Sequence, residues 1–139
     1  MTGNSKQVDL DKYAVFVDGV TSNPSKDYKS FLDSIEYLDG KGSNIQRLLT
    51  AAVGISAEGG EFMEIVKKML FQGKPWNDDN REHLIIELGD VMWYVMQACK
   101  ALDVSLDEVI AGNVEKLKKR YSGGDFNVYH SENRAADDR

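Results

Sequence analysis

Apolar side chains recur at helical spacing along most of this chain, with polar residues between them. From about residue 44 to 72 the apolar positions keep a 3.6-residue period, and from about 80 to 102 the pattern is apolar on nearly every side. A helix of the second kind lies at the centre of a bundle or in a contact between subunits. The pattern therefore predicts an all-α fold in which the chain pairs with a second copy of itself.

Shorter helices are predicted upstream from local signals. Asn23 and Pro24 fit an N-cap and a first helical position, which places a helix at about 24–38. Glycines then break it, and Ser43 is expected to cap the long helix that follows. Residues 9–20 fit either a short helix or an extended segment, and the helix is the favoured interpretation.

A last helix is expected after Ser105, which forms a capping box with Glu108. It should end near Tyr121, before a Ser-Gly-Gly sequence. We expect the chain to be one domain over residues 1–139, with its core at about 24–121 and a polar C-terminal tail at 122–139.

Three glycines interrupt the 44–72 helix, namely Gly54, Gly59 and Gly60. Each is about 1 kcal/mol less favourable than alanine inside a helix. A kink is one explanation. The other, which we favour for Gly59 and Gly60, is that they let a second helix or a ligand approach closely.

Composition narrows the class of protein. The net charge is −6 and the pI is near 4.9, which argues against a general affinity for nucleic acid or an anionic membrane. The single Cys99 forms no disulfide framework, and the polar N-terminus lacks the apolar segment of a signal peptide, so a cytoplasmic location is expected. The most apolar stretch, 84–102, contains charged residues and is interpreted as a buried helix instead of a membrane span.

Paired acids within the apolar stretches carry the candidate chemistry. Glu58 and Glu61 have i, i+3 spacing, as do Glu87 and Asp90, so each pair lies on one helix face. An isolated pair is usually a solvated face. Ionised carboxylates along a core face are costly unless paired or bound to metal, and two pairs on two helices could form a cage of oxygen ligands for Mg²⁺.

Candidate substrate contacts lie further along the chain. Asn113, Lys116 and Arg120 fall within about 60° of each other on the last helix, counting about 100° per residue, and could clamp an anion. Basic residues there could equally serve the helix dipole. Trp76, in the loop after the 44–72 helix, could pack under that loop or offer a stacking surface for a base.

These residues together resemble a known family. Residues 57–62 (AEGGEF), residues 87–94 (ELGDVMWY) and the later Asn113, Lys116, Arg120 and Tyr121 are similar to the motifs of MazG-type all-α nucleoside triphosphate pyrophosphohydrolases. The resemblance covers about residues 45–134 and is greatest to small, single-domain, phage-type members. Many members have a further acid where this chain has Ala57, which leaves the number of metal ions open.

The resemblance implies a four-helix bundle assembled as a dimer or a dimer of dimers. It implies a Mg²⁺-dependent enzyme, with Mn²⁺ as a possible substitute, that cleaves nucleoside triphosphates between the α and β phosphates. The products are a nucleoside monophosphate and pyrophosphate.

The resemblance also assigns roles to individual residues. The metal ligands would be Glu58, Glu61, Glu87 and Asp90, and Glu61 would also orient the attacking water. Substrate contacts would come from Lys116 and Arg120 at phosphate oxygens, Asn113 at sugar or phosphate, and Tyr121 beside them. Lys68 would neutralise the leaving pyrophosphate, unless it only pairs with Glu64.

Three alternatives remain beside this hypothesis. The first is an all-α enzyme specific for dUTP or dCTP. The second is a non-catalytic helical assembly protein, which suits the enclosed helix but gives buried acids no purpose. The third, a di-iron carboxylate bundle, needs Glu-x-x-His motifs, and neither His83 nor His130 has a glutamate three residues before it. His83 is interpreted as a surface histidine, with a ligand role as the alternative.

Overall fold

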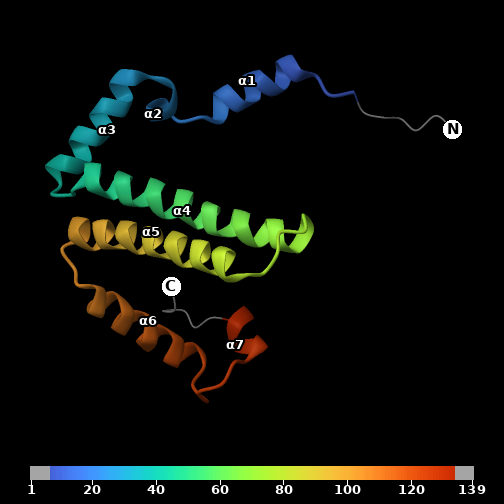
Figure 1. Ribbon diagram of the computed structural model, residues 1–139. Coiled ribbons are helices and arrows are strands. Elements are labelled where there is room, and N and C mark those ends of the chain that lie inside the picture. The colour runs from blue at the N-terminus through green and yellow to red at the C-terminus, as the bar shows by residue number, and fades with distance from the viewer. Residues whose placement is uncertain (1–6, 134–139) are drawn as a thin grey trace. The chain divides into compact units, whose positions relative to one another are not determined.

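The computed structural model describes residues 7–133, and every regular element within them is an α-helix (Figure 1). The helices are α1 (Leu10–Val20), α2 (Asn23–Lys26), α3 (Tyr28–Gly40), α4 (Ile45–Phe71), α5 (Asp78–Leu102), α6 (Leu106–Arg120) and α7 (Val128–Glu132). The expected all-α fold is confirmed. The chain divides into two compact units between Ser43 and Asn44. A single domain over residues 1–139 stays a prediction.

The first unit contains α1, α2 and α3. Residues 9–20 are helical as favoured, because the Asp9 side chain accepts a hydrogen bond from the Lys12 backbone N–H at 3.1 Å and caps α1. The continuous helix predicted at 24–38 was wrong. Asp27 is extended, with φ −124° and ψ 123°, and its carboxylate accepts hydrogen bonds from the Ser30 N–H at 2.9 Å and the Ser30 hydroxyl at 2.8 Å. Asp27 therefore starts a second helix, α3.

Two predicted caps were also wrong. Asn23 is the first residue of α2, and Ser22 occupies the N-cap position before it. Asn44 caps α4, accepting a hydrogen bond from the Arg47 N–H at 3.2 Å. The Ser43 hydroxyl donates instead to the Leu38 carbonyl at 2.7 Å, where it satisfies an acceptor at the end of α3.

The second unit is built on α4 and α5, which pack along each other as an antiparallel pair (Figure 1). Residues 72–77 connect them, and Asn77 caps α5 by accepting a hydrogen bond from the Asn80 N–H at 2.9 Å. The most buried apolar side chains of this pair are Ala51, Ile65 and Cys99. Their burial fixes which faces of α4 and α5 meet.

The pair is followed by α6 and α7. Ser105 caps α6 as expected, since its hydroxyl accepts a hydrogen bond from the Glu108 N–H at 3.1 Å. In the described residues α6 makes few contacts with α4 or α5. The short helix α7 lies where only a polar tail was expected, and Asn127 caps it by accepting a hydrogen bond from the His130 N–H at 3.2 Å.

An apolar stripe remains exposed on α5, away from α4. Its members are Ile85, Leu88, Met92 and Met96, at spacings of three and four residues that place them on one side of a helix. We call this set the α5 stripe. No helix in the described part of the chain is long and apolar enough to span a bilayer.

The glycines of α4 differ in their surroundings. Gly54 is buried, and a Cβ added there would overlap the ring of Tyr94, so the close approach of two helices occurs at this position. A Cβ added at Gly59 or Gly60 would meet nothing within 4 Å among the described residues. The close approach of a helix predicted at those two positions is therefore not found within residues 7–133, and approach by a ligand stays a prediction.

Candidate metal centre

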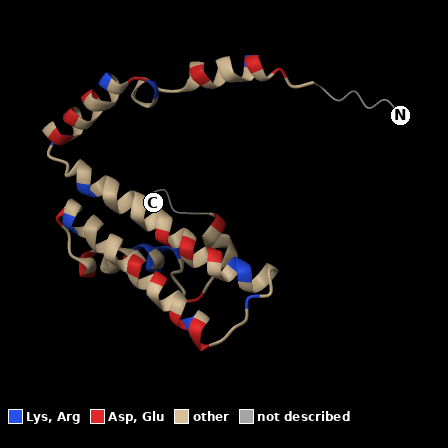
Figure 2. Ribbon diagram, turned by 45° about the horizontal axis from the view of Figure 1, so that its top comes forward, with Lys and Arg blue, Asp and Glu red and all other residues tan. Residues whose placement is uncertain are grey.

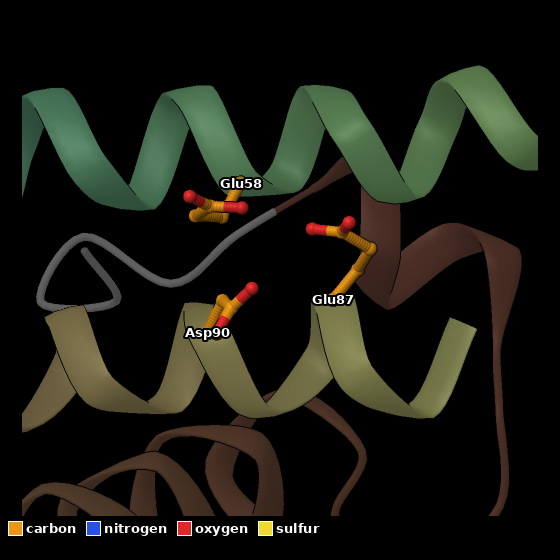
Figure 3. A group of neighbouring side chains, drawn as sticks. All are labelled: Glu58, Glu87 and Asp90. Carbon is orange, nitrogen blue, oxygen red and sulfur yellow. The ribbon is translucent and has the colours of Figure 1, made fainter. Parts of the chain in front are cut away.

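Three carboxylates meet between α4 and α5. Glu58 comes from α4, Glu87 and Asp90 come from α5, and one oxygen from each lies within 4.8 Å of the others. Figure 3 shows the three side chains reaching into the space between the two helices. The acidic segments of these helices also lie alongside each other in Figure 2. The fold therefore brings together one acid of the first predicted pair and both acids of the second.

The contact between Gly54 and Tyr94 sets the position of this cluster. Gly54 lies one turn before Glu58 on α4, and Tyr94 lies one turn after Asp90 on α5. Because α4 and α5 are antiparallel, the ring seated on Gly54 places Glu58 opposite Asp90. Tyr94 thus fixes the helix register at the acids.

Glu87 is the most enclosed of the three acids. Its side chain is 13% exposed, and its Oε2 atom is buried and has no hydrogen-bond partner among the described residues. Its other oxygen, Oε1, lies 3.2 Å from Nε2 of His83. A buried carboxylate oxygen without a donor is costly. A cation held at Oε2, or a proton shared with the neighbouring Glu58, would offset this cost.

The pKa of Glu58 is raised above its ordinary value. The main cause is a side-chain hydrogen bond that protonated Glu58 shares with Glu87. Partial burial raises the pKa further, as do the negative charges of Asp90, Glu87 and Glu61. Between the ordinary and the raised pKa, the folded chain keeps a proton that the unfolded chain has lost. The contribution of Glu58 to stability therefore falls as pH rises through that range.

The donor set fits a hard divalent cation. Carboxylate oxygens are the ligands that Mg²⁺ and Mn²⁺ take in proteins, and an open side leaves room for water and phosphate oxygens. The unpartnered Oε2 of Glu87 and the raised pKa of Glu58 both reflect negative charge that such an ion would neutralise. The residues present therefore fit the group.

The fourth predicted ligand, Glu61, is not part of this cluster. It is exposed one turn beyond Glu58, and its charge still acts on the Glu58 carboxyl. Adjacent i, i+3 positions differ in direction by about 60°, so only one acid of the α4 pair faces α5 directly. A ligand role for Glu61 stays a prediction.

An aromatic pair borders the acids. Trp93 and Tyr94 line a hollow of about 310 Å³ together with Glu58 and Asp90. Their rings meet edge to face, with centroids 4.9 Å apart, and Trp93 is 57% exposed. Sequence reasoning chose Trp76 and passed over Trp93, although its position three residues after Asp90 could have shown that it lies near the acids. Trp76 is 69% exposed and does not line this hollow.

Comparison with models of known protein families identifies the family of this chain. The model of the MazG nucleotide pyrophosphohydrolase domain matches residues 46–123. The chain belongs to the MazG family. The match includes α5 and α6 entire and all but the first residue of α4, and it excludes the first unit.

One relative found by sequence comparison is a phage protein. The "Gene 37 protein" of Mycobacterium phage L5 is 40% identical over 86 residues, which is 61% of this chain and 75% of that protein. The resemblance to a phage-type member is therefore confirmed. No solved structure matches the chain.

The remaining predicted contacts of this MazG chain lie apart from the acids along the sequence. Lys68 lies 3.5 Å from Glu64, so the ion pair considered for it is present. The set predicted on the last helix is at α6 and its C-cap, where Asn113 is exposed and Lys116, Arg120 and Tyr121 are half-buried. No Lys or Arg is among the four residues that line the hollow at Glu58. For Lys68 and for the predicted set on α6, contact with substrate stays a prediction.

Proposed function

We propose that this MazG chain is a Mg²⁺-dependent pyrophosphohydrolase that cleaves ribo- or deoxyribonucleoside triphosphates between the α and β phosphates. The products are a nucleoside monophosphate and pyrophosphate. The observation that supports the proposal is the approach of one oxygen each from Glu58, Glu87 and Asp90 to within 4.8 Å. Family membership supports the class of reaction.

The acids of the α4–α5 pair would hold the metal. Glu58, Glu87 and Asp90 offer converging oxygens, and Glu61 lies one turn further along α4. A Mg²⁺ ion held by these acids would supply positive charge for the phosphate groups and would make a bound water more acidic. Glu61 has an exposed carboxylate next to the cluster and is our candidate for orienting the water that attacks phosphorus.

Other residues would bind the nucleotide. Lys116 and Arg120 would contact phosphate oxygens, with Asn113 and Tyr121 beside them on α6. Lys68 would reach the leaving pyrophosphate, in exchange for its present contact with Glu64. Basic side chains are needed in addition to the metal ion, because the triphosphate is anionic and the protein carries a net charge of −6.

The base would meet an aromatic side chain. Trp93 borders the hollow at Glu58 and exposes more than half of its surface, so it is better placed than Trp76 to stack on a base held at the metal centre. Preference for dUTP or dCTP would be a narrower form of the same function. The phage relative supports an expected site of action in a host cytoplasm.

We further propose that the chain works as a homodimer or a homotetramer. The α5 stripe exposes four large apolar side chains on a helix whose opposite side packs against α4. Contiguous apolar surface of this kind marks a contact between proteins. A second copy would bury the stripe.

Product analysis tests the function. The protein should release pyrophosphate from nucleoside triphosphates with Mg²⁺ and none with a chelator. Glu87→Gln should abolish hydrolysis, whereas Glu82→Gln, which removes an exposed acid outside the cluster on the same helix, should not. Release of orthophosphate would move the cleavage point. Hydrolysis unchanged by Glu87→Gln would remove the metal centre from the reaction.

A non-catalytic assembly protein is the second candidate, and the exposed α5 stripe favours it. The unpartnered Glu87 Oε2 argues against it, because a scaffold gains nothing from that atom. Self-association of the wild-type protein without hydrolysis of any triphosphate would support this alternative.

A further inference from the structure

His83 stands beside the metal centre without being part of it. It lies one turn before Glu87 on α5, and its Nε2 is 3.2 Å from Glu87 Oε1. The His83 side chain is half exposed, whereas the Glu87 side chain that it contacts is 13% exposed. His83 is exposed, as expected of a surface histidine, and its i, i+4 spacing brings it to Glu87.

The contact makes the two oxygens of Glu87 unequal. Oε1 faces the imidazole, whereas Oε2 is buried and has no partner among residues 7–133. A histidine nitrogen could count as a member of a candidate metal cluster, yet the group of converging atoms consists of Glu58, Glu87 and Asp90 alone in this part of the chain. His83 therefore contacts Glu87 without joining the three converging acids.

We propose that His83 is a positioning residue that holds Glu87 Oε1, so that Oε2 is the atom presented to the metal ion. This inference rests on the proposed function only in requiring that the three acids bind a divalent ion. A glutamate side chain has three rotatable bonds, and ordering it opposes metal binding. A partner on Oε1 removes part of that cost before the ion arrives.

Partners of this kind have a measurable effect. Removing a residue that orients a metal ligand typically weakens metal affinity about 10- to 100-fold. His83 should therefore affect metal affinity more than it affects folding, since half of its own side chain is in solvent.

Binding of Mn²⁺ to the full chain without nucleotide, followed by electron paramagnetic resonance, tests the proposal. His83→Ala should raise the dissociation constant for Mn²⁺ about 10-fold or more. His83→Gln keeps an N–H donor at similar reach and should restore affinity to within a few-fold of wild type. Arg81→Ala, which removes an exposed cation two residues away, should leave affinity unchanged. Thermal unfolding without metal should change little in either His83 variant, because half of the His83 side chain is already in solvent.

Distinct outcomes contradict distinct parts. If wild type and His83→Ala bind Mn²⁺ equally well, the positioning role is wrong and the metal centre stands. If the bound Mn²⁺ shows hyperfine coupling to a histidine nitrogen that disappears in His83→Gln, then His83 is a ligand, and positioning is again wrong. If wild type binds no Mn²⁺, both the positioning role and the proposed function fail.

Discussion

Two alanine substitutions on one helix measure the packing that fixes the acid cluster. Gly54 and Gly59 both lie inside α4, so replacing either with alanine gains about 1 kcal/mol of helix propensity. They differ in their neighbours. A Cβ at Gly54 would overlap Cδ1, Cε1 and Cγ of the Tyr94 ring, whereas a Cβ at Gly59 would meet nothing within 4 Å in the described residues.

The size of the difference follows from the overlap. Overpacking a close contact costs about 1–3 kcal/mol, because the Tyr94 ring must leave its seat or the helices must separate. Gly59→Ala should therefore raise the free energy of unfolding by about 1 kcal/mol. The free energy of unfolding of Gly54→Ala should be about 1–3 kcal/mol lower than that of Gly59→Ala. The gain in helix propensity is common to both variants and cancels in this comparison.

Urea denaturation followed by circular dichroism gives the comparison, with both variants at the same protein concentration because association would add to stability. Tyr94→Ala in the Gly54→Ala background serves as a control: removing the ring should remove the penalty at position 54. Equal stability of Gly54→Ala and Gly59→Ala would refute the proposed close packing. A Gly59→Ala variant that is the less stable of the two would show that a second copy approaches at Gly59.

Four further outcomes are expected. Glu87→Gln should raise the unfolding temperature in chelator and abolish the stabilisation that Mg²⁺ gives wild type, and a scaffold protein would show no such Mg²⁺ effect. In chelator, Glu58→Gln should flatten the fall in stability that wild type shows as pH rises above the ordinary glutamate range, and an unchanged pH profile would contradict the raised pKa of Glu58. Met92→Lys, within the α5 stripe, should lower the sedimentation mass toward that of one chain, and an unchanged mass would place the subunit contact elsewhere. The chain has two tryptophans, so replacing one leaves the other to be observed alone. A non-hydrolysable triphosphate with Mg²⁺ should quench the fluorescence of Trp76→Phe, in which Trp93 remains, more than that of Trp93→Phe. The reverse order would place the base at Trp76.

The long helices were predictable because their pattern persists over many turns. The bounds of α4 and α5 agree with the periodicity to within two residues. Local choices were not predictable in the same way. Asp27 suits an exposed helix position as well as a cap, and only the hydrogen bonds to Ser30 show that the chain restarts there. Ser43 and Asn44 are both good caps, and the sequence does not rank them.

The sequence predicted that the two acid pairs could meet, but it did not show which acid of the α4 pair would face α5. Spacing shows that Glu58 and Glu61 share a side of α4, but the side that faces α5 is chosen by the contact of Gly54 with Tyr94. That contact joins residues 40 positions apart, and nothing in the local pattern indicates it. The contact of His83 with Glu87 could have been predicted from the sequence, because i, i+4 spacing on a helix brings such side chains together.

The convergence of Glu58, Glu87 and Asp90 depends on two helices that follow each other directly in the chain. One short loop, residues 72–77, separates the two helices, and closing it brings the acids together. During synthesis it can form as soon as α5 has emerged, before α6 and its basic residues exist. A divalent ion captured at that stage would offset the mutual repulsion of the acids and favour the paired helices. In that case the ion would contribute to folding before it contributed to the proposed hydrolysis.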